Sequence, residues 1–240
     1  MIVLGFDLES TGLDKVNDRP IEAAMALWTT KFNRSLDTRA ILIQSDGVKV
    51  TDEITEITGI NQSMVDKFGY TPEEAYDEMM YFVERAEALV AFNGKRFDVP
   101  MCQQWAKRLG KQFPDKLVID PFTDLPMRGQ EQITMCAKMG FCYDAHEAGA
   151  DVGAMLRLMG KFDFNIVLTR AQSPVIVVRS LQGRNENDKA KKHKFRWNPD
   201  RKIWWKAIKQ MDVDELAKAV NGEFRMEILD LQPEDLEDPQ

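Results

Sequence analysis

The sequence predicts an α/β fold, a mixed sheet flanked by helices, followed by a small α+β module. Short apolar runs of strand character alternate with segments of helical spacing through most of the 240 residues, as expected for a mixed sheet. Hydrophobic residues make up 44% and charged residues 30%, a globular balance that excludes a disordered or collagen-like chain. No apolar run reaches the roughly 18–20 residues of a membrane span, so we expect no membrane association.

The elements of the first domain can be assigned in chain order. The first apolar run ends in a turn-like Ser-Thr-Gly and reads as a buried strand, and the next two strands are expected to be antiparallel neighbours. Thr71 followed by Pro72 gives the clearest helix start, because Thr is a favoured N-cap and Pro fits the first helical position. The predicted strands are 2–6, 21–29, 39–43, 89–92 and 117–119, and the predicted helices are 72–86, 99–109, 131–139, 148–158 and 164–171.

The segment Gln172-Ser173-Pro174 predicts a domain boundary. We therefore expect a first domain over residues 1–171 and a small basic and aromatic α+β module over residues 172–231. Residues 232–240 are acidic and contain proline, which predicts a disordered tail. Within the module, the predicted strands are 175–178, 203–205 and 224–229, and the predicted helices are 186–193 and 213–220.

The net charge of −7 is unevenly distributed. Residues 183–209 hold ten Lys or Arg against three Asp or Glu, whereas residues 210–240 hold ten acidic residues against two basic ones. A basic block is therefore followed directly by an acidic end, and the basic block is a candidate for contact with nucleic acid.

Cysteine and histidine usage restricts the chemistry. Three cysteines without a CxxC pair argue against a disulfide framework and a zinc site, and indicate a reducing compartment. Two histidines exclude a His-rich metal centre, so any metal must bind mainly to carboxylates. The N-terminal residues lack the basic and apolar regions of a signal peptide, and we expect a cytoplasmic protein.

Three separated segments carry unusual carboxylates. Asp7 and Glu9 lie two residues apart at the end of the first strand, so both point to one face, where their repulsion favours a cation between them. Asp98 follows the turn after the strand 89–92; metal binding and N-capping of the next helix both remain open for it. Asp151 lies in the first turns of the helix 148–158, five residues after His146 in the preceding loop. Alone, Asp7 and Glu9 could equally be a capping residue and a solvent-facing one.

Taken together, in this order and with these spacers, the three segments resemble the DEDDh family of 3′→5′ exonucleases. This DnaQ-like group includes the proofreading subunit of bacterial replicative DNA polymerase, oligoribonuclease and RNase T. The turn Thr11-Gly12-Leu13, the strand Ile21-Glu22-Ala23-Ala24 and the loop Ile57-Thr58-Gly59-Ile60 also agree with the family. The resemblance covers roughly residues 1–165 and implies an RNase H-like exonuclease fold.

The resemblance also implies roles for individual residues. The metal ligands would be Asp7, Glu9, Asp98 and Asp151, which would hold two Mg²⁺ or Mn²⁺ ions through oxygen atoms. His146 would be the general base that takes a proton from the attacking water, and it completes the catalytic set with the four carboxylates. The terminal nucleotide would be bound by Ser10, Thr11, Gly12, Leu13, Asn93 and Phe97. Nucleoside 5′-monophosphates would be released one at a time from a free 3′ end.

The basic segment of the module resembles a small domain of uncharacterised function seen in phage and mobile-element proteins, which favours a phage or bacterial member and the cytoplasm of a bacterial or phage-infected cell. Basic residues interleaved with tryptophans suit single-stranded nucleic acid, since aromatic rings stack on bases and Lys or Arg neutralise phosphates. The candidate contacts are Lys189, Lys192, Arg196, Trp197, Arg201 and Lys202. The alternative, in which the tryptophans form the core of the module and the lysines a solvated helix face, stays open.

We therefore expect a metal-dependent 3′→5′ exonuclease acting on DNA, with single strands preferred. One alternative is a 3′→5′ exoribonuclease that trims RNA, because nothing in the sequence identifies the sugar. Another is a nucleic-acid-binding or polymerase-associated subunit in which nuclease activity is secondary. The expected partners are single-stranded DNA or 3′ ends, and a DNA polymerase or another replication or repair protein.

Overall fold

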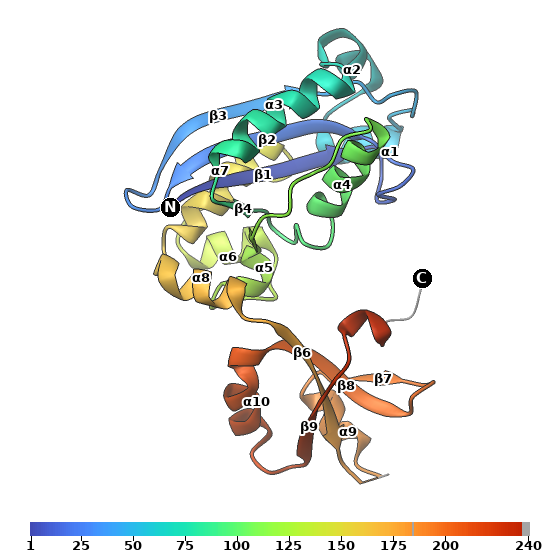
Figure 1. The fold of residues 1–240 in the computed structure, drawn as a ribbon, viewed down its shortest axis with the longest axis vertical. Helices are drawn as coiled ribbons and strands as arrows, with labels where there is room; N and C mark the ends of the chain where they lie inside the picture. Colours follow the sequence, from blue (N-terminus) through green and yellow to red (C-terminus); the bar gives the residue numbers. More distant parts are fainter. Residues whose placement is uncertain (184, 237–240) are drawn as a thin grey trace. The chain divides into compact units, whose positions relative to one another are not determined.

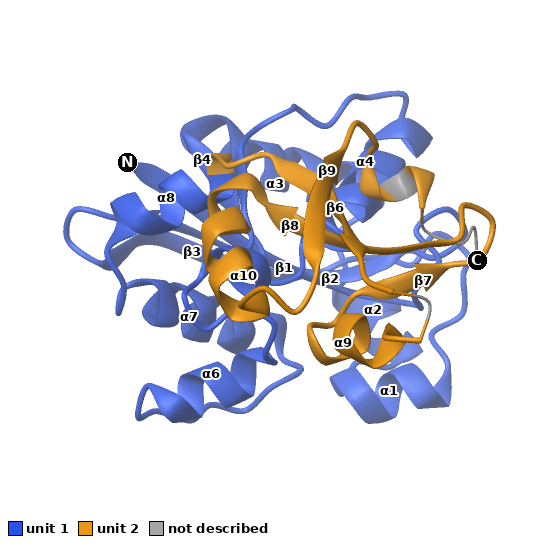
Figure 2. Cartoon of the chain, turned by 90° about the horizontal axis from the view of Figure 1, so that it is seen from below, with its two compact units in different colours: residues 1–171 blue, residues 172–240 orange. Residues whose placement is uncertain are grey.

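The computed structural model describes residues 1–183 and 185–236, and it divides into two compact units, residues 1–171 and 172–240 (Figure 2). The strands of unit 1 are β1 (Ile2–Ser10), β2 (Pro20–Thr29), β3 (Arg34–Leu42), β4 (Ala88–Val90) and β5 (Val118–Ile119). Its helices are α1 (Asp52–Thr58), α2 (Gln62–Phe68), α3 (Pro72–Arg85), α4 (Asp98–Arg108), α5 (Pro121–Asp124), α6 (Gln132–Lys138), α7 (Ala148–Met159) and α8 (Phe164–Gln172).

The five strands of unit 1 form one mixed sheet with the order β3-β2-β1-β4-β5, and Figure 1 labels all of them except β5. The pairs β1–β2 and β2–β3 are antiparallel, whereas the pairs β1–β4 and β4–β5 are parallel. Helices cover both faces, with α3 and α4 on one side and α7 on the other (Figure 1). The predicted α/β class, a mixed sheet flanked by helices, is confirmed.

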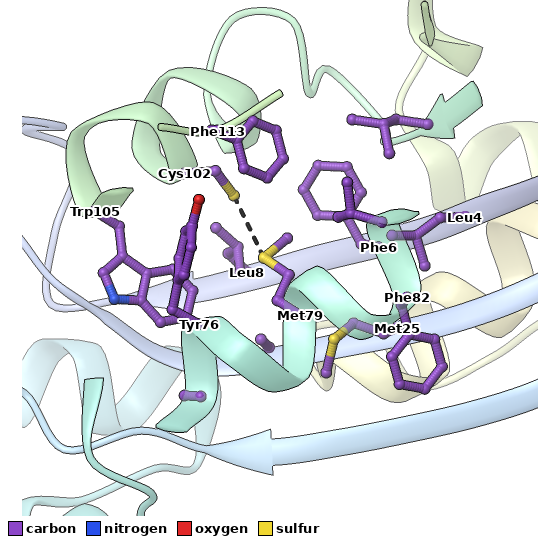
Figure 3. Close-up of a cluster of buried hydrophobic side chains, with 14 of the residues drawn as sticks. Leu4, Phe6, Leu8, Met25, Tyr76, Met79, Phe82, Cys102, Trp105 and Phe113 are labelled. Carbon is purple, nitrogen blue, oxygen red and sulfur yellow. Dashed lines mark hydrogen bonds between the residues drawn. The ribbon is translucent and has the colours of Figure 1, made fainter. Parts of the chain in front are cut away.

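Alternation along β1 divides its side chains between two hydrophobic cores. Leu4, Phe6 and Leu8 face α3 and α4, where they pack with Tyr76, Met79, Phe82, Cys102 and Trp105 (Figure 3). Val3 faces the other core, formed with α7 and its neighbours. Because side chains alternate in a strand, Gly5, Asp7 and Glu9 lie on this second face as well. The predicted first strand ended at Phe6; the observed one continues to Ser10, so both carboxylates are inside it.

Gly5 allows α7 to approach the centre of the sheet. A Cβ atom built on Gly5 would lie 2.9 Å from the side-chain carbons of Leu156 in α7, closer than real carbon contacts. The missing side chain therefore sets the distance between β1 and α7. It also sets the distance between the carboxylates of β1 and the residue that α7 presents one and a half turns earlier, Asp151.

The helix start at Thr71 is confirmed: Thr71 and Glu74 form a capping box, and Pro72 occupies the first turn of α3. Three helices, α1, α2 and α5, were not predicted. The first two are seven-residue helices capped by Thr51 and Asn61, and α1 buries no residue completely, so it has no apolar stripe to detect. The edge strand β3 begins at Arg34, five residues before the predicted start. The prediction missed these residues because most of them are exposed and give no apolar pattern.

Unit 2 is a four-stranded antiparallel sheet with the order β7-β8-β6-β9. Its elements are β6 (Val175–Leu181), α9 (Asn187–Lys192), β7 (Arg196–Asn198), β8 (Ile203–Lys209), η1 (Gln210–Asp212), α10 (Val213–Val220), β9 (Arg225–Leu229) and η2 (Pro233–Asp235). One face packs against α9 and α10 through a core that includes Val178, Phe195 and Leu216. The other face carries Val177 and Trp205.

The beginning of the predicted acidic tail differs from the expected disorder. Residues 233–235 form η2, and Leu236 is buried against Val177 and Trp205, because the sequence supplies one apolar side chain among the acidic ones. The carbonyl of Leu236 also accepts a hydrogen bond from Asn198 Nδ2 at 3.1 Å. The rest of that tail, residues 237–240, lies outside the described residues. Among the described residues, no helix is both long and apolar enough to cross a membrane.

Replacing Gly5 with valine should destabilise unit 1 by about 1–3 kcal/mol, because the new side chain would overlap Leu156 and push α7 away. Urea unfolding would measure the change. Gly153→Ala is the matched control: a Cβ atom there meets nothing within 4 Å, and alanine favours the helix by about 0.5–1 kcal/mol. A Gly5→Val protein as stable as the wild type would contradict the close packing of α7 on β1.

Candidate active site

Three carboxylates from two elements meet on the α7 face of the sheet. Asp7 and Glu9 come from β1 and Asp151 from the first turn of α7. Each offers one oxygen atom, and these three atoms lie within 4.8 Å of one another. All three side chains are half-buried. A group of hard oxygen donors at this spacing can hold a divalent cation such as Mg²⁺ or Mn²⁺.

Asp98 lies beside this cluster but does not belong to the compact group of three. It is the first residue of α4 and is buried, and its Oδ1 atom accepts a hydrogen bond from the backbone N–H of Leu8 at 3.1 Å. Phe97 occupies the N-cap position, so the alternative in which Asp98 is that cap is wrong. The bond to Leu8 ties Asp98 to the strand between Asp7 and Glu9, within reach of their charges.

Burial and mutual repulsion make the carboxylates hard to ionise together. Burial, followed by the charges of Asp98 and Glu9, raises the pKa of Asp7 well above its ordinary value. Burial raises the pKa of Glu9 to about 7, with further contributions from Glu22, Asp151 and Asp98. Burial likewise raises the pKa of Asp98 to about 7. A bound cation would reverse this repulsion, because it favours the charged form of every carboxylate around it.

Asp151 is held by donors that the sequence did not identify. Tyr143 donates a hydrogen bond through its hydroxyl to Asp151 Oδ1 at 2.8 Å. Gln132 Nε2 donates to that same oxygen at 3.2 Å, to the carbonyl of Asp151 at 2.9 Å and to the Tyr143 hydroxyl at 2.9 Å. The helix α6 and the loop after it therefore fix the orientation of the Asp151 carboxylate. No motif in the sequence marks either donor.

His146 lies at the edge of the site. Its backbone N–H donates to Asp151 Oδ2 at 2.9 Å, and its side chain is exposed. Its φ of 70° falls in the left-handed region, which histidine adopts infrequently outside special positions. The loop thus presents the imidazole to solvent, while the backbone of the same residue is bonded to the Asp151 carboxylate.

Glu22 is a fifth carboxylate that the sequence analysis placed only in a strand. It lies directly opposite Glu9 in the β1–β2 pair, and its Oε2 atom accepts a hydrogen bond from the N–H of Ala148 at 3.4 Å. Burial raises the pKa of Glu22. This bond connects β2 to the first residue of α7. A signal was present, since Glu22 is the one charged residue in the otherwise apolar segment 20–28.

The predicted nucleotide contacts in the turn after β1 differ in their exposure to solvent. Ser10 and Thr11 are buried, and their hydroxyls donate to the Gly12 carbonyl at 2.6 Å and to Asp18 Oδ1 at 2.8 Å. A Cβ atom on Gly12 would lie 2.4 Å from an Asp18 oxygen, so a larger residue there would displace the carboxylate that the Thr11 hydroxyl contacts. Leu13 is 80% exposed and projects from the turn that these contacts hold.

The segment that precedes Asp98, residues 93–97, forms a tight loop. Asn93 is exposed with a φ of 56°, and its N–H donates to Asp120 Oδ1 at 2.8 Å. Asp120 is buried, and its own N–H donates to the buried Asp124 at 2.9 Å. Phe97 is half-buried, with Lys15 Nζ located 5.9 Å from its ring centre. Two buried aspartates from the β5–α5 segment thus fix the loop that leads to Asp98.

The candidate contacts in unit 2 do not share one environment. Lys189 and Lys192 form ion pairs with Glu186 and Glu223. The Arg196 guanidinium lies 4.6 Å from the centre of the buried Trp205 ring. Of the exposed candidates, three lie at or near the β7–β8 turn: Trp197, Arg201 and Lys202.

The fold and the carboxylate cluster define the class of protein, the RNase H-like exonucleases. The family model described as "Exonuclease" (RNase T) matches residues 4–159, and the chain belongs to this exonuclease family. It is of the DEDDh, DnaQ-like type, as the sequence motifs predicted. The chain is 35% identical over 105 residues to the DNA polymerase III PolC-type of Caldanaerobacter subterraneus subsp. tengcongensis. The matched region is 44% of this chain but only 7% of the polymerase.

Solved structures share the fold at low sequence identity. The nuclease domain of 3′hExo, a DEDDh family member bound to rAMP, superposes with a TM-score of 0.57 and 18% identity over 67% of this chain and 90% of that one. A structure of exonuclease I gives a TM-score of 0.66 and 14% identity over 92% and 67% of the two chains. Escherichia coli exonuclease I in complex with a dA16 oligonucleotide gives 0.60 and 15% over 76% and 48%.

Raising the pH should destabilise the metal-free protein. Because Glu9 and Asp98 have pKa values of about 7 when folded, the native state keeps protons that the unfolded chain, with pKa values near about 4, has already lost. Their stabilising contribution is complete at low pH and is lost as the pH rises through about 7. The thermal midpoint in EDTA should therefore fall between about pH 5 and about pH 8, and less so in Glu9→Gln. A thermal midpoint that rises over this pH interval would contradict the repulsion between the buried carboxylates.

Removing the Tyr143 hydroxyl should weaken cation binding at the cluster. In Tyr143→Phe, Asp151 loses its shortest side-chain donor, and a hydrogen bond to a charged group contributes about 1.5–3 kcal/mol, so we expect roughly tenfold weaker Mn²⁺ binding. Calorimetric titration of the metal-free protein with Mn²⁺ would measure this affinity. Tyr81→Phe, on the exposed face of α3, is the matched control. Equal Mn²⁺ affinities in both variants would show that Tyr143 does not orient Asp151.

Proposed function

We propose that this chain is a metal-dependent 3′→5′ exonuclease that hydrolyses phosphodiesters from the 3′ end of DNA, prefers single strands and releases nucleoside 5′-monophosphates. The observation that carries the proposal is the convergence of Asp7, Glu9 and Asp151 within 4.8 Å, with Asp98 tied to the strand between the first two. Membership of the exonuclease family supports the same reaction.

The four carboxylates fit a pair of hard divalent cations. Asp7, Glu9 and Asp151 would hold the first, and Asp98 would join Asp7 in holding the second. Two divalent cations, when bound, stabilise the attacking and leaving oxygens of an in-line phosphoryl displacement. The raised pKa values of Asp7, Glu9 and Asp98 support this assignment, because a site built for cations is electrostatically unfavourable without them.

His146 is the proposed general base. Its backbone is fixed to Asp151, so its ring is held at the rim of the carboxylate cluster while remaining open to the solvent and the substrate. There the imidazole takes the proton of the attacking water, and the exposed position lets it release that proton to solvent afterwards. The Glu22 carboxylate on β2 accepts a hydrogen bond from the N–H of Ala148, two residues after His146, and so restrains the same loop.

The terminal nucleotide would bind between two fixed loops. The turn at Ser10, Thr11 and Gly12 is internally hydrogen-bonded, so it offers backbone groups and the exposed Leu13 without rearrangement. Phe97, with Asn93 in the same loop, offers an aromatic edge from the other side. An apolar side chain facing an aromatic one would grip a nucleobase without reading its identity.

DNA is the proposed substrate, and RNA is the second candidate. Similarity to a DNA polymerase III and the fold shared with an exonuclease bound to dA16 support DNA. The fold shared with a nuclease bound to rAMP keeps RNA trimming as the alternative. Association with a DNA polymerase or another replication or repair protein is proposed on the polymerase similarity. A nucleic-acid-binding subunit with secondary nuclease activity is disfavoured, because all five catalytic positions are filled.

A direct test uses 5′-labelled single-stranded DNA, duplex DNA and matched RNA, each incubated with Mg²⁺ or Mn²⁺. We expect a descending ladder from the 3′ end, formed most rapidly on single-stranded DNA, with mononucleotide products. Asp98→Asn keeps the size of the side chain and removes its charge, and should lower the rate by about a hundredfold or more. EDTA should abolish the ladder.

Three results would each contradict part of the proposal. Internal cuts, or products shortened from the 5′ end, would exclude 3′→5′ exonuclease action. A ladder that survives in Asp98→Asn and in Asp7→Asn would exclude these carboxylates as ligands. A faster ladder on RNA than on DNA would transfer the substrate assignment to the exoribonuclease alternative.

A further inference from the structure

The three tryptophans of unit 2 have different surroundings. Trp205 is buried on one face of the sheet, where it packs with Val177 and Leu236. Trp197 and Trp204 lie directly opposite each other in the β7–β8 pair, on the other face. Trp204 is half-buried, whereas Trp197, on the edge strand β7, is 47% exposed. One large aromatic ring is therefore available to a ligand.

Trp204 gives the exposed ring a fixed support. The two ring centres are 5.6 Å apart, with the planes tilted by 50°. Trp204 Nε1 donates to Asn187 Oδ1 at 3.0 Å, and the Trp204 ring packs against the core under α9. A ring held in this way loses little freedom when a flat ligand stacks on it, because it is already ordered.

One cationic side chain lies beside the Trp204 ring, and two more lie in the turn between the strands that carry the rings. Arg201 and Lys202 are exposed in the β7–β8 turn, and neither forms an ion pair with any residue that the structure describes. Lys191 Nζ lies 5.9 Å from the centre of the Trp204 ring, and its carboxylate neighbour, Asp188, is fully exposed at 3.9 Å. An aromatic surface bordered by positive charge matches a ligand with flat rings and a negative backbone.

We propose that the Trp197–Trp204 pair stacks an unpaired base of single-stranded DNA, and that Lys191, Arg201 and Lys202 contact the neighbouring phosphates. A duplex cannot present a base face to these rings without unstacking, so the site selects single strands. The choice of DNA as ligand rests on the proposed function, whereas the stacking geometry does not. Unit 2 would then hold substrate by a contact separate from the carboxylate cluster.

The test measures binding of a fluorescein-labelled oligothymidylate to the full chain by anisotropy, in EDTA so that no cleavage occurs. Trp197→Ala should bind about fivefold or more weakly, and Trp197→Phe should recover most of the affinity, since a phenyl ring also stacks. Ile228→Ala is the matched control, because Ile228 is 55% exposed on the same face at the opposite edge of the sheet. It should bind like the wild type.

An abasic strand of equal length separates stacking from charge. It offers the same phosphates without bases, so Trp197→Ala and the wild type should bind it equally. Arg201→Glu should weaken binding to both strands, and more at low salt. A matched oligouridylate strand shows whether RNA is bound in the same way; tighter binding to it would replace DNA as the ligand.

The proposal is overturned if Trp197→Ala binds oligothymidylate like the wild type. It is also overturned if the substitution weakens binding to the abasic strand as much as binding to oligothymidylate. The first result would point instead to a protein partner at this surface. Hydrolysis of the p-nitrophenyl ester of thymidine 5′-monophosphate reports on the carboxylate cluster alone. Its rate should be unchanged in Ile228→Ala. Absence of that hydrolysis in the wild type would remove the proposed function but leave the binding result intact.

Discussion

The site depends on the close packing of one helix against one strand. Gly5 has no side chain, so α7 lies directly over β1, with Leu156 filling the space. Asp151, further up the same helix, is thereby brought to the two carboxylates that β1 presents on that face. A wider separation between the strand and the helix would leave these groups too far apart to share a cation. The glycine in the strand therefore leaves room for the helix that carries Asp151.

This packing is achieved against electrostatic repulsion. The apolar cores on both faces of the sheet hold the acidic groups together, and burial adds to their mutual repulsion by removing water. Hydrogen bonds then orient the groups: Leu8 donates to Asp98, while Tyr143, Gln132 and the backbone of His146 donate to Asp151. The protein thus uses the stability of its core to maintain a concentration of negative charge that a cation can relieve.

The sequence predicted the sheet and marked the acidic residues that the structure brings together, because their signals are local. Alternation and short spacing placed Asp7 and Glu9 on one face of a strand, and Thr71 with Pro72 located a helix start. The helix α1 and the first half of β3 were missed because neither buries an apolar stripe. Gln132, Tyr143 and the close approach at Gly5 depend on contacts between distant segments, which a single sequence does not encode in any spacing.

Asp7, Glu9 and Asp151 are proposed to hold one divalent cation jointly. Crystals of the full chain grown with Mn²⁺ and thymidine 5′-monophosphate, measured at the manganese absorption edge, would test it directly. We expect an anomalous peak coordinated by oxygens of Asp7, Glu9 and Asp151, with a second peak near Asp98. Manganese bound elsewhere, with no peak among these carboxylates, would contradict it.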